Sequence, residues 1–366
     1  MNIVIVGIGV IGARHVACFG RAGHRITTVD RKEGADHDRV ADVPERSDVD
    51  AWVVATPTAA HLAVVTEILR CQPNARILLE KPACYPAELG DLVDLVRRHP
   101  RARIVVNDVY AHSRVVRRFA ESVHRAAAGD PIRKITIEFT KNRVLDVANG
   151  RFVDTQYGEA GYECFHMLSI LRAILPAEHY ERYLRTNPAL VTPEMRVRTA
   201  VPELPEVELY TSSGGAIGFA GLAGFAFSAS TAKRYLARSI IPFSAELRYR
   251  FADVELVSGK HVTLVFEPSY GVAADYKNEH TVHVRDAGSQ QRVTVSGNHF
   301  EEALQAQLDF LCGADEGTAV LRLAEHRLMA ALGLTAATGS FAWPVEPELQ
   351  DGLPGNGEEL ARFGSA

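Results

Sequence analysis

The sequence predicts an α/β domain with a doubly wound parallel sheet, followed by an α+β domain with an open, mostly antiparallel sheet. In the first third of the chain, apolar strand-like runs alternate with helical patterns, which is typical of βαβ units. After residues 129–131 (Gly-Asp-Pro) the pattern changes to a series of hairpin-like strands. We therefore expect domains at 1–125 and 126–345, and a loosely held tail at 346–366.

The parallel sheet is expected from short apolar strands that are each followed by a helix or a loop. The first strand, Ile3–Val6, consists of four β-branched residues and precedes a glycine turn. The other strands are expected at Arg25–Val29, Ala51–Thr56, Arg76–Leu79 and Arg103–Asn107. Helices are expected at Gly12–Arg21, at Thr58–Arg70, from Pro86 to just before His99, and at His112–Ala128.

The second domain opens with Ile132–Thr140, which alternates with the period of two that is typical of a strand. Further strands are expected at Glu206–Thr211, Ala216–Leu222, Glu246–Phe251, His261–Phe266, His280–Arg285 and Arg292–Ser296. Helices are expected at Gly161–Ile174, Phe300–Leu311 and Val320–Ala336, and we expect the last one to return to one of the two domains.

A glycine-rich turn follows the first strand and reads Gly7-Ile8-Gly9-Val10-Ile11-Gly12. Gly7 allows a tight turn, Gly9 lets a pyrophosphate approach the backbone, and Gly12 permits close helix–strand packing. The helix N-terminus that follows offers N–H groups and a positive dipole end to phosphates. Such glycines also occur in structural turns of unrelated α/β proteins, but the strand before and the helix after favour a Rossmann-type dinucleotide site.

Asp30 ends the second strand, at the distance expected for an acid that binds a ribose diol. A carboxylate there accepts from a 2′-hydroxyl and repels a 2′-phosphate, so NAD is favoured as the cofactor. Arg31 and Lys32 follow directly and could tolerate NADP.

Two further segments come directly after strands, at the sheet edge where cofactors bind. The first runs from Thr56-Pro57 to His61, and Thr58 in it also suits a helix N-cap. The second is Glu80-Lys81-Pro82. The Lys81 ammonium could bind the nicotinamide ribose or a substrate oxygen, although a lysine at a strand end is commonly a solvated surface residue.

Together, the turn from Gly7 to Gly12, Asp30, the loop from Ala55 to His61, and Glu80-Lys81-Pro82 resemble the glucose–fructose oxidoreductase / inositol dehydrogenase / MocA family of NAD(P)-dependent oxidoreductases. The resemblance implies a Rossmann domain, an open-faced sheet domain that binds substrate, and a homodimer or homotetramer. It also implies hydride transfer at a sugar or cyclitol carbon, or reduction of a related ketone or imine.

Members of this family usually carry an Asp-x-x-x-His pattern on a helix, and His166 falls on the family histidine. The resemblance implies that His166 is the catalytic acid/base, supported by Lys81. The place of the aspartate is held by Tyr162, which could donate a proton or orient His166, while Glu163 points in a different direction on an ideal helix. A purely structural role for His166 is the alternative.

The substrate rim differs from the family pattern, because Tyr110-Ala111-His112-Ser113 stands where relatives often carry Arg-x-x-Pro. Tyr110, Arg143, Arg151 and Glu163 are our candidates for substrate contacts. Lys141, Asn142, Arg143 and Arg151 lie before the His166 helix, and arginines there could hold a carboxylate or phosphate. A solvated loop is the alternative for these residues.

Charge and composition indicate which classes of partner and which cellular compartment to expect. The net charge of −5 and the lack of a basic run argue against a nucleic acid or an anionic membrane as a partner. Five scattered cysteines fit a reducing cytoplasm, and no spacing of histidines or cysteines predicts a metal site. The expected partner is a small-molecule substrate. An imine or ketone reductase of a specialised pathway and a non-catalytic dinucleotide sensor are the alternative functions.

Overall fold

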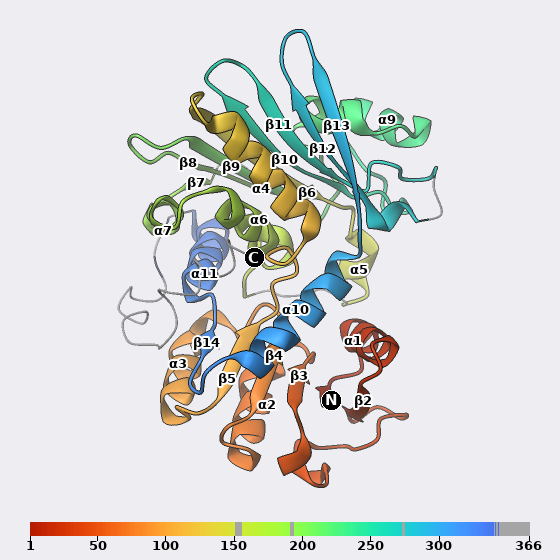
Figure 1. Cartoon of the computed structure of the whole chain (residues 1–366), viewed down its shortest axis with the longest axis vertical. Helices are drawn as coiled ribbons and strands as arrows, with labels where there is room; N and C mark the ends of the chain where they lie inside the picture. The colour runs from red at the N-terminus through yellow and green to blue at the C-terminus, as the bar shows by residue number, and fades with distance from the viewer. Residues whose placement is uncertain (151–155, 191–193, 273–274, 340, 342, 344–366) are drawn as a thin grey trace. The chain divides into compact units, whose positions relative to one another are not determined.

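The computed structural model describes residues 1–150, 156–190, 194–272, 275–339, 341 and 343 (Figure 1). The chain divides into two compact units by its internal contacts. Among the described residues, unit 1 consists of Met1–Val109, Phe300–Arg327 and Trp343, and unit 2 of Tyr110–His299 and residues 328–341.

Two parts of the chain fall in other units than in the sequence-based ranges of 1–125 and 126–345: residues 110–125 belong to unit 2, and Phe300–Arg327 returns to unit 1. The expected tail at 346–366 lies outside the described residues. The role of the second domain in substrate binding and oligomerisation stays a prediction.

Unit 1 contains a six-stranded parallel sheet in the order β14-β5-β4-β3-β1-β2. Its strands are β1 (Asn2–Val6), β2 (Arg25–Val29), β3 (Ala51–Val54), β4 (Arg76–Leu79), β5 (Arg103–Val106) and β14 (Ala319–Val320). The chain leaves β1 for β2 on one side and then crosses to β3 on the other side. The carboxyl ends of β1 and β3 therefore flank the switch point of the sheet, where α/β sheets bind ligands.

The helices of this unit are α1 (Val10–Arg21), α2 (Thr58–Cys71), α3 (Leu89–Arg98), α10 (His299–Gly313) and the start of α11 (Leu323–Thr338). On one face of the sheet, Ile3 and Ile5 of β1 pack in one buried cluster with Leu304 and Leu308 of α10. Trp52 of β3 lies near the other face, where its Nε1 donates to Gln72 at the end of α2 over 2.7 Å. The sheet is thus covered by helices on both faces, as the sequence predicts.

Unit 2 contains an eight-stranded sheet in the order β13-β12-β11-β10-β6-β9-β8-β7. Its strands are β6 (Ile132–Thr140), β7 (Ala189–Leu190), β8 (Met195–Thr199), β9 (Glu206–Ser212), β10 (Tyr249–Leu256), β11 (His261–Phe266), β12 (Glu279–Arg285) and β13 (Gln290–Ser296). Only β6 and β9 pair in parallel, and the other neighbours are antiparallel. The predicted fold class, a doubly wound parallel sheet followed by a mostly antiparallel one, is confirmed.

The helices of unit 2 are α4 (Arg114–Ala127), α5 (Val144–Ala148), α6 (Ala160–Ile174), α7 (Ala177–Arg185), α8 (Ala220–Ala223) and α9 (Ser230–Ala237). Helices α4 and α6 pack against the strands of the sheet and against each other (Figure 1). Tyr249 and Phe251 of β10 pack in a second cluster with residues of α8 and α9. Because side chains alternate along a strand, Arg250 between them points to the opposite face.

Some predicted elements of unit 2 are wrong. The expected strand Ala216–Leu222 does not form, because the N–H groups of Gly218 and Phe219 donate to the buried Glu138 carboxylate over 3.0 and 2.8 Å. The strand expected at Glu246–Phe251 lies instead at Tyr249–Leu256, and β7, β8, α7 and α9 were not predicted.

Candidate functional site

The glycine turn in unit 1 is shaped by contacts that exclude side chains. Gly7 has φ +94°, and a Cβ added there would lie 2.8 Å from the backbone of Ala55 and Thr56. A Cβ on Gly12 would lie 1.8 Å from the Gly7 carbonyl oxygen. These two glycines are therefore required by the packing of β1, α1 and the β3 loop, as predicted from the sequence.

Gly9 differs from its two neighbours in the motif. A Cβ on Gly9 would meet no atom of the described residues within 4 Å, and its φ of −65° is open to every residue type. Gly9 is the N-cap of α1, which begins at Val10 with no side-chain cap and no acidic residue in its first turn. No packing contact in the part of unit 1 that the structure describes thus requires glycine here, and the space over a helix N-terminus fits a phosphate group that approaches the backbone closely.

Asp30 lies at the end of β2 beside this turn. Its Oδ2 accepts from the Ile8 N–H over 2.8 Å, and its Oδ1 accepts from the Lys32 N–H over 3.1 Å. The carboxylate therefore joins the turn after β1 to the turn after β2. Each oxygen retains a further lone pair that could accept from a ribose hydroxyl.

The β3 loop carries Thr56 and is held by His61. The imidazole of His61 is buried, with Nε2 2.8 Å from the Thr56 carbonyl oxygen and Nδ1 2.9 Å from the Pro82 carbonyl oxygen. Burial lowers its pKa against the effect of these two carbonyls. His61 thus ties the Thr56-Pro57 loop to the Lys81-Pro82 loop.

Thr56 itself has a buried Oγ1 with no hydrogen-bond partner among the described residues. A buried hydroxyl is normally satisfied, so an unpartnered one beside an open glycine turn fits a site for a polar ligand. Gly9, the uncapped α1, Asp30 and Thr56 all lie at the carboxyl edge of the sheet in unit 1. This set fits a dinucleotide, with the turn at its phosphates and Asp30 at a ribose.

Glu80 is the centre of a buried network. Its Oε1 lies 2.7 Å from His15 Nε2 on α1 and accepts from Asn107 Nδ2 at the end of β5 over 2.6 Å. Asn107 Oδ1 accepts in turn from Gln307 Nε2 on α10 over 2.8 Å. Burial would raise the pKa of Glu80, but these hydrogen bonds and the Lys81 charge outweigh it and lower the pKa. Glu80 therefore acts as a fixed anion next to Lys81.

The sequence did not single out His15, Asn107 or Gln307 as members of this network. Gln307 is buried at 1% exposure on α10, far from Glu80 in the sequence. The signal that the sequence offered for this network was Gln307, a polar residue on the apolar face of the predicted helix Phe300–Leu311.

The backbone that follows Lys81 is clamped by His326 of α11. The Ala83 N–H donates to His326 Nε2 over 2.9 Å, so the imidazole proton resides on Nδ1, which donates to the Arg322 carbonyl over 2.7 Å. Burial lowers the pKa of His326, which keeps the ring neutral. Lys81 therefore sits between a buried anion, Glu80, and a loop that α11 holds in place.

In unit 2, Tyr110 and His166 lie together. Their rings are 5.0 Å apart in an edge-on arrangement, and the Tyr110 hydroxyl accepts from Arg250 Nη1 over 3.3 Å. Phe139 and Phe266 also contact the Tyr110 ring. Tyr110 is buried and His166 of α6 is half-buried, so the tyrosine fixes one side of the His166 ring.

Glu163 lies one helical turn before His166 and is buried at 4% exposure. Its Oε1 accepts from Arg250 Nη2 over 2.6 Å and from Arg143 Nη2. The guanidinium of Arg143 also lies 5.8 Å from the centre of the Tyr162 ring. The structure thus brings together four of the predicted residues, Tyr110, Arg143, Tyr162 and Glu163, around an arginine that the sequence did not single out.

Arg151, another predicted substrate contact, lies outside the described residues. The catalytic or binding role of each of these residues stays a prediction.

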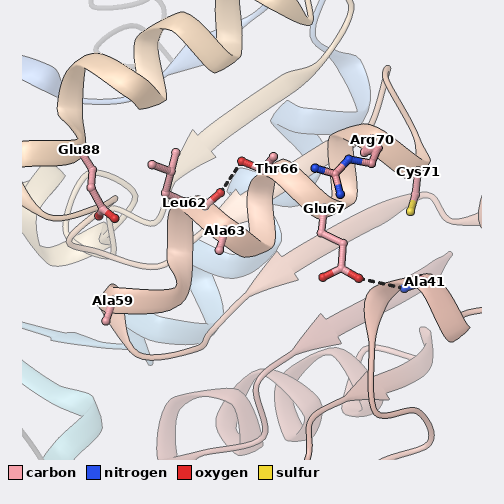
Figure 2. Close-up of a pocket in the computed structure, with 9 residues that line it drawn as sticks. All are labelled: Ala41, Ala59, Leu62, Ala63, Thr66, Glu67, Arg70, Cys71 and Glu88. Atoms are coloured by element: carbon pink, nitrogen blue, oxygen red, sulfur yellow. Dashed lines mark hydrogen bonds between the residues drawn. The ribbon is translucent and has the colours of Figure 1, made fainter.

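A hollow of about 550 Å³ lies along α2 in unit 1 (Figure 2). Leu62 and Ala63 line it together with Glu67, whose Oε1 accepts from the Ala41 N–H over 3.3 Å. None of the residues predicted to bind cofactor or substrate lines this hollow.

Among the residues that the structure describes, no group of three or more His, Cys, Asp and Glu residues is placed to hold a metal ion. No helix there has both the length and the apolar character needed to cross a membrane.

The sequence matches no protein-family model and no curated protein. Solved structures, in contrast, match almost the whole chain. KijD10, a 3-ketoreductase from Actinomadura kijaniata in complex with NADP and TDP-benzene, has a TM-score of 0.62 at 13% identity, and the match covers 93% of this chain and 97% of KijD10. An oxidoreductase from Agrobacterium radiobacter in complex with NAD+ and L-tartaric acid has a TM-score of 0.62 at 14% identity, with 94% and 98% covered.

A third match is levoglucosan dehydrogenase in complex with NADH and levoglucosan, with a TM-score of 0.62 at 12% identity and coverage of 94% and 100%. This chain shares their fold. The resemblance to the glucose–fructose oxidoreductase / inositol dehydrogenase / MocA family is thus supported at the level of the fold. The shared fold also agrees with the position of the glycine turn at the switch point of the parallel sheet.

Proposed function

We propose that this protein is an NAD(P)-dependent oxidoreductase that transfers a hydride between the nicotinamide and the oxygen-bearing carbon of a sugar or cyclitol. The observation that carries the proposal is the open space at Gly9, over the uncapped N-terminus of α1. The three structural neighbours, each in complex with NAD+, NADH or NADP, support it.

On the cofactor side, the first N–H groups of α1 bind the pyrophosphate, with Gly9 allowing the close approach. Asp30 accepts from a ribose hydroxyl, which favours NAD, while Arg31 and Lys32 leave NADP possible. Thr56 and Pro57 line the same edge, and the Thr56 hydroxyl finds a partner in the cofactor. His61 acts as a positioning residue, since both its nitrogens contact backbone carbonyls of the two loops.

On the substrate side, His166 exchanges the proton. In the oxidative direction the imidazole takes the proton from the substrate hydroxyl, and in the reductive direction it returns that proton to the oxygen. When bound, the nicotinamide accepts or supplies the hydride. Lys81, held beside the anionic Glu80, stabilises negative charge that develops on the substrate oxygen.

The substrate side of the proposed site is completed by Tyr162, Tyr110, Arg143, Arg151 and Glu163. Tyr110 orients the His166 ring through its edge contact, and Tyr162 occupies the place of the family aspartate. Glu163 is engaged by Arg143 and Arg250, so we assign it to holding these arginines and not to proton transfer. Homodimer or homotetramer formation, a cytoplasmic location and a small molecule as the sole partner stay predictions.

The experiment has two steps. Fluorescence titration with NADH and NADPH measures cofactor binding, and a panel of sugars, cyclitols and their ketones then tests hydride transfer at 340 nm. We expect His166→Ala to lower kcat by about 10²- to 10⁴-fold with NADH binding retained. His179→Ala, a change at a partly exposed histidine on α7, is the matched control.

An unchanged kcat in His166→Ala would show that another residue is the acid/base. Cofactor binding without turnover of any substrate in the panel would favour a dinucleotide sensor.

A further inference from the structure

A group of cations shares one face of the sheet in unit 2. Arg250 of β10 is paired directly with Phe139 of β6, so their side chains point to the same face. Arg248 and Lys141 lie just outside the ladder, next to Tyr249 and Thr140, which form its last pair. The charges of Arg250 and Tyr110 act on Arg248, and the charge of Arg248 acts on Lys141, so both cations lie near the face on which Tyr110 contacts Phe139 and Arg250.

The pairing of these cations is uneven. Arg250 and Arg143 share the carboxylate of Glu163. The side chains of Lys141 and Arg248, in contrast, make no hydrogen bond or ion pair within the part of the chain that the structure describes. Arg250 is buried at 9% exposure, and its Nε has no hydrogen-bond partner among the described residues.

The charges of these residues act on one another. The pKa of Arg248 is lowered, chiefly by the charge of Arg250 and then by burial. The pKa of Lys141 is lowered by burial first, and then by the charges of Arg248 and Arg143. Glu267, Glu163 and Asp146 act in the opposite direction but do not reverse either shift. The face thus carries an excess of positive charge that is partly removed from water.

Half-buried cations with no counter-ion are costly unless an anion from outside joins them. Arginine binds carboxylates and phosphates through two parallel hydrogen bonds, and a lysine adds a point charge. We propose that Lys141, Arg248 and Arg250 bind an anionic group, a carboxylate or a phosphate, of the substrate. That this anion belongs to a substrate rests on the proposed function, whereas anion binding itself does not.

The consequence is a narrower substrate class. The proposed anion site adjoins Tyr110, because Arg250 donates to the Tyr110 hydroxyl, and the Tyr110 ring contacts His166. The substrate would therefore be a sugar acid or a sugar phosphate, with the anion held by Lys141, Arg248 and Arg250 and the reacting hydroxyl at His166. An uncharged sugar would lack the group that these cations hold.

The test measures anion binding by the full chain without requiring turnover. Inorganic phosphate and D-glucuronate are titrated by calorimetry, with D-glucose and an equal ionic strength of sodium chloride as references. The phosphate and glucuronate arms distinguish a phosphate site from a carboxylate site. We expect at least one anion to bind, and Arg248→Gln or Lys141→Gln to weaken binding about tenfold or more.

The matched controls are Arg234→Gln and Lys233→Gln, which change exposed cations on α9 of the same unit. They should bind the anion as the wild type does. Anion bound at the glycine turn would be retained in all four variants and is thereby separated from this site. Absence of binding beyond chloride, or unchanged binding in Arg248→Gln and Lys141→Gln, would overturn the proposal.

Stability without ligand provides a second readout. Since Arg248 is repelled by Arg250, Arg248→Gln should raise the Tm of the ligand-free protein, whereas a structural arginine would lower the Tm when removed. A lowered Tm would also overturn the proposal. NADH titration of the same proteins separates the two hypotheses: failure of the wild type to bind NADH contradicts the proposed function and leaves the anion measurement to be judged on its own.

Discussion

Glu163 on α6 accepts a hydrogen bond from Arg250 on β10, with 2.6 Å between Oε1 and Nη2. The same oxygen also accepts from Arg143. Both arginines and the glutamate are largely buried, so the carboxylate is the counter-charge that allows two guanidinium groups to leave water together. The Glu163 carboxylate thereby joins α6, the helix that carries His166, to the sheet at the proposed anion site.

Glu163→Gln should therefore destabilise the fold strongly. The amide keeps the shape of the side chain but removes the negative charge that two buried guanidinium groups share, and breaking a buried ion pair in this way costs about 3–5 kcal/mol. Urea denaturation at pH 7 measures the loss. Glu178→Gln, at an exposed carboxylate on α7, is the control and should change the free energy of unfolding by less than about 0.5 kcal/mol. If Glu163→Gln lowers the free energy of unfolding by less than about 1 kcal/mol, water already compensates the charge of the two guanidinium groups.

Alanine at the glycines of the turn should separate binding from folding. A Cβ at Gly9 meets no atom within 4 Å among the residues that the structure describes, so Gly9→Ala should cost no more than about 1 kcal/mol of stability, from the poorer N-cap. It should nevertheless weaken NADH binding at least tenfold, because the methyl group occupies the approach of the pyrophosphate. Fluorescence titration and urea denaturation on the same sample measure the two effects.

Gly12→Ala is the contrasting variant. Its methyl group would overlap the Gly7 carbonyl oxygen, so the chain must shift and the free energy of unfolding should fall by several kcal/mol. Equal effects of the two substitutions on stability would contradict the separate roles assigned to Gly9 and Gly12.

The strands of the parallel sheet could be predicted because burial on both faces demands continuous apolar runs, as in Ile3–Val6. Strand β14 has only two residues, Ala319 and Val320, and is defined by its pairing with Ile104 and Val105 of β5. No local pattern shows such a pairing. The return of Phe300–Arg327 to unit 1 is equally a matter of contacts between distant segments.

The site likewise combines a local sequence pattern, which can be predicted, with contacts between distant segments, which cannot. The glycine turn is local, so Gly7, Gly9 and Gly12 could be identified from spacing alone. The proposed anion site depends on the pairing of β6 with β10, whose last pair, Tyr249 with Thr140, leaves Arg248 and Lys141 next to each other in space across more than 100 residues of chain. The alternation of Arg248 and Arg250 within the predicted strand Glu246–Phe251 was visible in the sequence, but the residues that pack around them were not.

Glu138 predicts a dependence of stability on pH. It is fully buried in the sheet of unit 2, and burial raises its pKa to about 8, against the hydrogen bonds from Gly218, Phe219 and Thr140 that lower it. The unfolded chain releases this proton near pH 4.5, so between about pH 4.5 and 8 the folded state binds one proton more. The free energy of unfolding should fall as the pH rises through this window.

Glu138→Gln carries no titrating group and is the reference. The stability of the wild type relative to this variant should decrease by up to about 1.4 kcal/mol for each pH unit between pH 5.5 and 7.5. Urea denaturation at several pH values measures both proteins. A difference that stays constant across this range would show that the folded carboxyl titrates at an ordinary pKa.

His326 should position Lys81 without contacting the reactants itself. His326→Leu removes the acceptor of the buried Ala83 N–H, which should cost about 1–3 kcal/mol of stability. It also frees the backbone two residues after Lys81, so we expect kcat to fall while the dissociation constant for NADH stays unchanged. His326→Gln offers an amide oxygen near the position of Nε2 and should restore part of both losses. If His326→Leu lowers stability but leaves kcat unchanged, the clamp serves the fold alone and the Lys81 loop keeps its position without it.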